Sequence, residues 1–92
     1  MITAIVLIKA ETHKISELGQ ELVKIDGVRE VFSVAGRYDL VAIVRVSDHE
    51  KLAEIISDKA GQLVGIGESE TLIAFRVFSQ RESEAGFDLG LD

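Results

Sequence analysis

The chain of 92 residues contains no cysteine, and it has few basic residues for its size. Without cysteine it can form neither a disulfide framework nor a thiolate metal site, and it has no thiol nucleophile. Its formal charge is −6, from 10 Lys and Arg against 16 Asp and Glu, and the basic residues form no run. Because phosphate backbones are bound mainly by clustered Lys and Arg, these features argue against direct binding of nucleic acid.

The sequence also lacks a long apolar segment and a glycine-rich phosphate loop. The apolar start, residues 2–8, is far too short to span a bilayer and has no basic leader, so we expect a cytoplasmic protein with no membrane partner. Gly65-Ile66-Gly67 precedes an expected strand rather than a helix, which argues against a nucleotide site. A chain this short makes one domain, and self-association is a common way for it to bury more surface.

The apolar pattern predicts four strands and two helices in the order βαββαβ. The first segment is short, uninterrupted and rich in β-branched residues, as in a strand covered on both faces. Two later segments repeat apolar residues at spacings of three and four, which indicates amphipathic helices. The expected strands are residues 2–9, 28–35, 39–46 and 68–78, and the expected helices run from about residue 12 to 25 and from residue 47 to the glycines at 65 and 67.

A capping pattern and glycines set the ends of the expected helices. Ser47 and Glu50 stand in capping-box register, so the second helix should begin at Ser47. Gly27 follows the first helix, and Gly65 and Gly67 follow the second. Glycine readily takes the left-handed conformation that closes a helix.

An internal repeat at an offset of 38 residues supports this order. Residues 2–8 (ITAIVLI) align with residues 40–46 (LVAIVRV), as expected if each half is one strand–helix–strand unit. Two such units with right-handed crossovers interleave into a four-stranded antiparallel sheet that carries both helices on one face. The predicted fold is therefore α+β and ferredoxin-like. The same offset superimposes Gly27 on Gly65, Glu30 on Glu68, Leu18 on Ile56 and Ile25 on Leu63.

The two expected central strands are apolar on both faces. An antiparallel sheet with one solvated face alternates apolar and polar residues, and these strands do not. Large apolar patches are uncommon on monomers, so we expect a second copy to cover the other face in a symmetric homodimer of the dimeric α/β-barrel type. The helix-facing set is Ile2, Ala4, Val6, Ile8, Leu40, Ala42, Val44 and Val46, and the predicted interface residues are Ile5, Leu7, Phe32, Val34, Ile43, Arg45, Leu72 and Arg76.

Two arginines stand inside expected strands on the predicted interface. Arg45 and Arg76 could hold an anionic ligand by two-pronged hydrogen bonding. The alternative is that they pair with an acid across the dimer, either Glu30 or Glu70.

No residue pattern predicts a metal, a cofactor or a catalytic group. His13 and His49 occupy equivalent helix starts in the two halves, so nothing brings them together as a metal pair, and we expect both to be solvated. Serines and threonines occur without a recognisable base arrangement. The sequence therefore predicts a protein that is not an enzyme.

The segment 34–39 has the strongest character of a binding site. Gly36 permits a positive φ and a close approach of the backbone, Tyr38 offers an apolar plate with a hydroxyl, and Asp39 could receive an ammonium group. A small zwitterion would suit these groups. The alternative is that Gly36 and Asp39 only build the turn of a hairpin between the second and third strands.

On these residues the sequence resembles the ligand-binding domain of the Lrp/AsnC family, the leucine-responsive and asparagine-responsive regulators. The resemblance runs from Met1 to about Ser79 and is carried by residues 26–28 (DGV), 36–40 (GRYDL) and 70–75 (ETLIAF). It implies an effector pocket between dimers, and dimers that assemble into tetramers, octamers or decamers. By this resemblance the amino-acid ligand would be contacted by Gly36, Tyr38 and Asp39, with Ser69 and Thr71 from a neighbouring subunit.

The resemblance also sets what we expect of function. Full-length family members carry an N-terminal helix-turn-helix, whereas this chain begins with the first strand. It looks like a stand-alone version that would act on transcription through mixed assembly with a full-length regulator and would not bind DNA itself. Residues 1–79 would sense an amino acid or similar small effector and oligomerise, and residues 80–92 would form a tail, either frayed or an interface arm.

Three alternatives remain open. A dimeric α/β-barrel oxygenase or isomerase has similar topology, but it would need polar residues between sheet and helices, where this sequence is apolar. An amino-acid-binding ACT domain has a glycine-rich loop after the first strand, whereas residues 10–13 contain no glycine. A purely structural assembly module would be separated from a sensor by a ligand screen.

Overall fold

The computed structural model describes residues 1–80, and its elements follow the predicted order. Four strands and two helical segments follow one another in the order βαββαβ. The first helical segment is a 3-10 turn followed by an α-helix, and the second is an α-helix followed by a π turn and a 3-10 turn. The strands are β1 (Ile2–Ala10), β2 (Val28–Ser33), β3 (Leu40–Val46) and β4 (Ile66–Ala74). The helical segments are η1 (Thr12–Lys14) with α1 (Ile15–Val23), and α2 (His49–Ala53) with the π turn η2 (Glu54–Lys59) and η3 (Ala60–Gln62).

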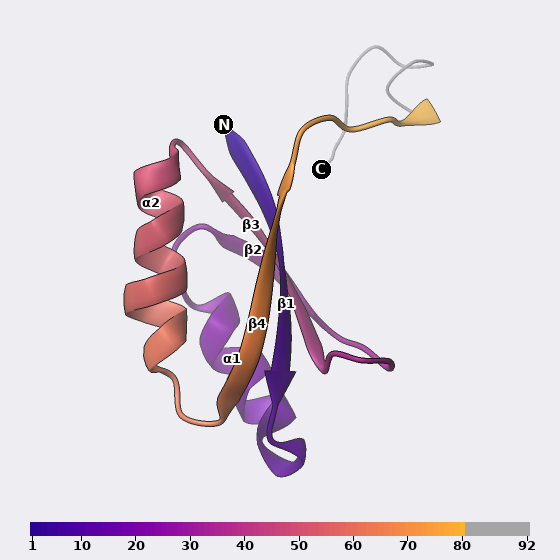
Figure 1. Ribbon diagram of the computed structural model, residues 1–92, viewed down its shortest axis with the longest axis vertical. Helices are drawn as coiled ribbons and strands as arrows, with labels where there is room; N and C mark the ends of the chain where they lie inside the picture. Colours follow the sequence, from indigo (N-terminus) through magenta and orange to yellow (C-terminus); the bar gives the residue numbers. More distant parts are fainter. Residues whose placement is uncertain (81–92) are drawn as a thin grey trace.

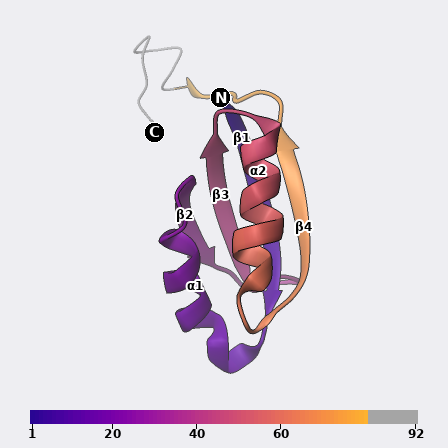
Figure 2. The same ribbon diagram turned by 90° about the vertical axis from the view of Figure 1, so that its left-hand side faces the viewer.

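The four strands form one antiparallel sheet in the order β2-β3-β1-β4. The two strands related by the sequence repeat, β1 and β3, therefore lie in the centre, as predicted. Both helical segments lie on the same side of the sheet (Figures 1 and 2). This arrangement confirms the ferredoxin-like fold. No helix within residues 1–80 is long and apolar enough to cross a membrane.

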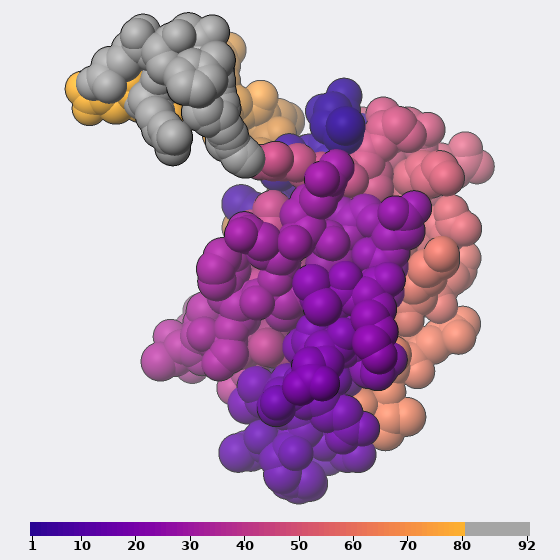
Figure 3. Space-filling model, turned by 180° about the vertical axis from the view of Figure 1, so that it is seen from behind, coloured from indigo at the N-terminus to yellow at the C-terminus, as the bar shows by residue number. Residues whose placement is uncertain are grey.

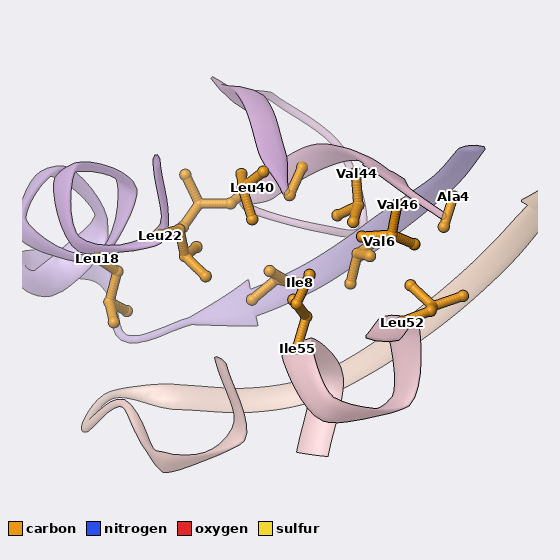
Figure 4. Close-up of a cluster of buried hydrophobic side chains, with 12 residues drawn as sticks. Ala4, Val6, Ile8, Leu18, Leu22, Leu40, Val44, Val46, Leu52 and Ile55 are labelled. Carbon is orange, nitrogen blue, oxygen red and sulfur yellow. The ribbon is translucent and has the colours of Figure 1, made fainter. Parts of the chain in front are cut away.

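The core fills the space between the sheet and the helices (Figure 4). In β3 every second residue from Leu40 to Val46 is buried, and the residues between them are half-buried. The predicted helix-facing set is confirmed, except that Ile2 is only half-buried. The buried residues are Ala4, Val6, Ile8, Leu18, Leu22, Val28, Leu40, Ala42, Val44, Val46, Leu52 and Ile55.

Helix α2 begins one residue later than the capping box predicts. Its N-cap is Asp48, whose Oδ1 accepts a hydrogen bond from the Lys51 backbone N–H at 2.8 Å. Ser47 instead donates its hydroxyl to Asp48 Oδ2 at 3.4 Å. The prediction of Ser47 as the cap was wrong because a carboxylate at the next position is an equally good or better cap.

Strand β4 begins and ends earlier than predicted. Gly67, expected to end the second helix, lies inside the strand, and Gly65 alone takes a positive φ there. At the other end, Ala74 pairs with Thr3, and β1 has only Ile2 left to offer as a further partner. The strand therefore stops at Ala74, and Arg76, predicted inside it, lies beyond the sheet.

Gly27 and Gly65, which the repeat superimposes, have the same backbone conformation, with φ of 102° and 101°. At Gly27 a Cβ atom would lie 2.8 Å from Ile55 Cδ1 and 3.0 Å from Val46 Cγ1. The position therefore requires glycine for two reasons, its left-handed backbone and its close packing against the core.

We predict that Gly27→Ala lowers the free energy of unfolding by about 2–4 kcal/mol, because backbone strain and overpacking add together. Gly36→Ala is the matched control. Gly36 also has a positive φ, 136°, but no atom lies within 4 Å of its would-be Cβ, so only backbone strain of about 1–2 kcal/mol applies. Urea unfolding followed by circular dichroism at a fixed protein concentration measures both. Equal losses in the two variants would contradict the packing role of Gly27.

Candidate functional site

The segment joining β2 to β3 is fastened to the end of β1 by Asp39. The Asp39 backbone N–H donates to Ile8 O at 2.9 Å, and Asp39 Oδ2 accepts from the Ala10 N–H at 2.8 Å. The Val34 N–H donates to Asp39 O at 3.0 Å, which closes the hairpin at its own base. Asp39 therefore has a structural role within the chain, and the segment it holds projects from the body of the molecule as the magenta loop in Figure 3.

Tyr38 fastens the same hairpin to β4. Its hydroxyl donates to Glu70 Oε1 at 2.8 Å, and the Arg37 guanidinium carbon lies 5.7 Å from the centroid of its ring. The pKa of Tyr38 is raised above its ordinary value of 10.0, first by this hydrogen bond and then by desolvation and the charge of Glu70. Arg37 acts in the opposite direction. Glu70 is a site residue that the sequence did not identify in this role.

Gly36 has open space around it. Its positive φ of 136° agrees with the predicted freedom of its backbone, and nothing lies within 4 Å of the position that a Cβ atom would occupy. The backbone at Gly36 is therefore accessible to a ligand or to a neighbouring subunit.

Ser69 and Thr71 flank Glu70 on β4 but do not meet the hairpin within one chain. They pair with Ile8 and Val6, whose side chains are buried under the helices. Ser69 also lines a small cavity of about 30 Å³ beside Ile56 and Ala60. Among the described residues, neither side chain forms a hydrogen bond with the segment 36–39. Their predicted contribution to a site on a neighbouring subunit remains a prediction.

The open face of the sheet, the face away from the helices, carries a row of apolar side chains. Ile5 pairs with Ile43 on one side and with Leu72 on the other, and Leu7 lies beside Val41. Ile5, Leu7 and Ile43 are only half-buried, while Phe32 and Leu72 expose 48% and 43% of their surface, and Val34 is also exposed. One chain therefore leaves this face uncovered.

Further apolar side chains follow the end of β4. Phe75 is 97% exposed, and Val77 and Phe78 are also well exposed. The predicted tail, residues 80–92, lies outside the described residues apart from Gln80. The exposed apolar surface of the chain thus continues past the last strand.

The predicted ion pairs of Arg45 and Arg76 with Glu30 or Glu70 would join two copies across a dimer, so a single chain does not test them and they remain a prediction. Arg45 is half-buried beside the open face, and Glu70 is already bound by Tyr38.

His13 is exposed, with Nε2 3.7 Å from Glu11 Oε1. Within residues 1–80 no group of three His, Asp or Glu side chains could hold a metal ion.

We predict that Glu70→Gln lowers the pKa of Tyr38 toward 10.0, because it weakens the hydrogen bond to the phenol and removes the negative charge beside it. The contact stabilises the fold while the phenol is protonated, and this contribution is lost as the pH rises through the raised pKa. Tyr38 is the only tyrosine, so the near-ultraviolet absorbance of tyrosinate reports on it alone. Glu68→Gln, an exposed neighbour, is the control. A titration midpoint that Glu70→Gln leaves unchanged would show that the contact is not made in solution.

Comparison with known proteins gives the family. The family model of the Lrp/AsnC ligand binding domain matches residues 3–84. The HTH-type transcriptional regulator FL11 of Pyrococcus furiosus is 33% identical over 79 residues, which cover 86% of this chain and 52% of that protein. The crystal structure of TTHA0845 from Thermus thermophilus is 41% identical, with a TM-score of 0.82, and the match covers 87% of this chain and 100% of that one.

A more distant structure has the same fold. The transcriptional regulator NMB0573 of Neisseria meningitidis, solved as an L-Met complex, has a TM-score of 0.77 at 11% identity, over 86% of this chain and 53% of that one. The first curated regulators are matched over only part of their length, from 39% to 52%. With its fold and most of its length matched by one family model, the chain belongs to the Lrp/AsnC family, and the match is to the ligand-binding domain of that family.

Proposed function

We propose that this domain senses an amino acid or a similar small effector and that effector binding shifts the balance between its oligomeric states. The observation that carries the proposal is the open face of the sheet, which is apolar and which neither helix covers. A ligand alters such a balance only through different affinities for the states, so a site built where subunits meet would act on assembly directly.

Association through the open face is the first step of the proposal. Fully burying one large apolar side chain contributes about 1.5–3 kcal/mol, and less where the residue is already half-buried. A symmetric pair supplies the same set twice, because each copy presents the same patch. Association costs about 4–15 kcal/mol in lost freedom, which burial of several such residues on both copies can offset. The predicted interface residues that line the face are Ile5, Leu7, Phe32, Ile43 and Leu72.

We predict that Phe32→Lys with Leu72→Lys makes the chain monomeric at concentrations where the wild type is a dimer or larger. Both side chains are exposed in one chain, so the variant should still fold. Val23→Lys with Val64→Lys is the matched control, because these residues are also exposed and apolar but lie in α1 and before β4. Sedimentation equilibrium measures the mass. A monomeric wild type at high concentration, or equal effects of the two double variants, would contradict the proposed interface.

Effector binding at the hairpin is the second step. Asp39 uses Oδ2 to hold Ala10, and among the described residues its Oδ1 has no hydrogen-bond partner. That oxygen is available for the ammonium group of an amino acid. Tyr38 offers its ring and Gly36 an open backbone, while Ser69 and Thr71 would come from a neighbouring subunit. The L-Met complex of the Neisseria regulator supports an amino acid as the ligand class.

The regulatory outcome follows from the relatives. They are helix-turn-helix transcriptional regulators, and this chain matches their ligand-binding part. We infer that it works in the cytoplasm and acts on transcription through assembly, with itself in dimers, tetramers or larger rings and with full-length regulators of the family. Contacts to DNA would be made by those regulators.

We predict that calorimetry across the standard amino acids finds at least one that binds and that light scattering shows a change of assembly with it. Asp39→Asn should weaken that binding by roughly tenfold or more, because it removes the charge that meets the ammonium group. The asparagine oxygen can still accept from Ala10, so the hairpin is kept. Asp58→Asn, an exposed acid in η2, is the control.

Two results would contradict different parts of the proposal. If no amino acid binds, the sensor hypothesis fails and the chain is an assembly module, in which Asp39 and Tyr38 only hold the hairpin. If an amino acid binds with equal affinity to Asp39→Asn and wild type, sensing stands but the hairpin is not where the ammonium group is bound.

A further inference from the structure

A second and larger hollow lies at the end of β3 that is opposite to the hairpin. It is a groove of about 650 Å³ between the segment that leads from α1 into β2 and the second helical segment. Gly27, at the turn into β2, and Ser47, at the turn after β3, both line it. Its size is within the usual range for small-molecule sites. None of the residues that we assign to the effector site belongs to it.

Basic side chains gather at this groove although the protein is acidic. Residues 1–80 contain nine Lys and Arg, and five of them line the groove, against two acids, Asp26 and Glu54. The chain as a whole has a charge of −6. The groove is therefore positively charged, whereas the protein as a whole is negatively charged. The five basic residues are Lys24, Arg29, Arg45, Lys51 and Lys59. Arg45 borders the groove through its backbone N–H, which donates to Gly27 O at 2.8 Å, while its place in β3 puts its side chain on the open face, so the charge at the rim comes from the other four.

Most of these cations have no partner within the described part of the chain. Lys24 pairs with Glu21 at 3.3 Å. The side chains of the other four form no ion pair with any residue in 1–80. Because the cations at the groove outnumber its two acids, they repel one another, and an anion in the groove would relieve this repulsion.

The floor of the groove is apolar. Val28, Val46 and Ile55 line it and are buried, while the cationic side chains other than Arg45 are exposed around them. Gly27 lets the chain pass close to Val46 and Ile55, so no side chain fills the space at that point. A ligand with several negative charges and a less polar part would match both the rim and the floor.

We propose that this groove binds a compact oligophosphate, either inorganic or attached to a small organic group such as a nucleoside. Several phosphates in one small molecule can engage several Lys and Arg at once by charge-assisted hydrogen bonds. A nucleic acid fits less well, because the negative charge of the rest of the protein repels an extended polyanion outside the groove. The basic residues are far apart in the sequence, so no basic run predicts the site, and they come together only in the folded chain.

The test uses Lys51→Gln with Lys59→Gln in the whole chain. Both lysines are exposed on the second helical segment, away from the open face and from the hairpin, and glutamine keeps a long polar side chain. Lys9→Gln with Lys14→Gln is the matched control, with the same change of net charge outside the groove. The probes are inorganic tripolyphosphate and ATP, measured by calorimetry at physiological ionic strength, with amide chemical shifts to locate the site.

We expect both probes to bind wild type and the control equally, and to bind the Lys51/Lys59 variant more weakly by roughly tenfold. Amide shifts should fall on residues 24–29 and 45–59. Tighter binding of ATP than of tripolyphosphate would place the nucleoside on the apolar floor, and equal binding would assign the site to phosphate alone. No saturable binding of either probe, equal weakening in both double variants, or shifts elsewhere would overturn the proposal.

Discussion

The structure depends on a mismatch between an apolar sheet and the helices that cover it. Both faces of the central strands β1 and β3 carry aliphatic side chains, but both helical segments lie on one face. On that face Ala4, Val6 and Leu22 are sealed from water. On the other face Ile5, Ile43 and Leu72 lie in one row with nothing from the described chain above them. Because burying this apolar surface against a second copy would release free energy, association is the expected state.

Much of the fold is predictable from the sequence because its signals are local or repeated. The alternation in residues 40–46 and the 38-residue repeat predict the central strands and their two faces. The repeat also predicts that Gly27 and Gly65 are equivalent, and they do have the same backbone conformation. The wrong predictions concern the ends of elements, where a neighbouring residue in space or in sequence determines the boundary. Asp48 displaces Ser47 as the helix cap, and β4 ends where β1 has no more residues to pair with. A pattern within β4 alone cannot show that limit.

The candidate site, like the fold, could be predicted only in part from the sequence. Gly36, Tyr38 and Asp39 could be chosen from their chemistry, but the partners of two of them could not. Asp39 bonds to Ala10, 29 residues away, and Tyr38 bonds to Glu70, 32 residues away. Contacts at such separations are set by the packing of whole strands. They show that the groups chosen as ligand contacts also hold the hairpin, so a site role and a structural role are not exclusive here.

This double role suggests how a small ligand could influence assembly. The hairpin is tied to β1 through Asp39 and to β4 through Tyr38, and both strands carry apolar residues of the open face, among them Leu7 and Leu72. Leu7 lies opposite Glu70 itself, so the residue that receives Tyr38 belongs to the same sheet face that a second copy would cover. A ligand bound by Asp39 Oδ1 and the Tyr38 ring would therefore lie beside the residues that tie the hairpin to that face. The coupling then needs no long path through the core, because site and interface share the same strands.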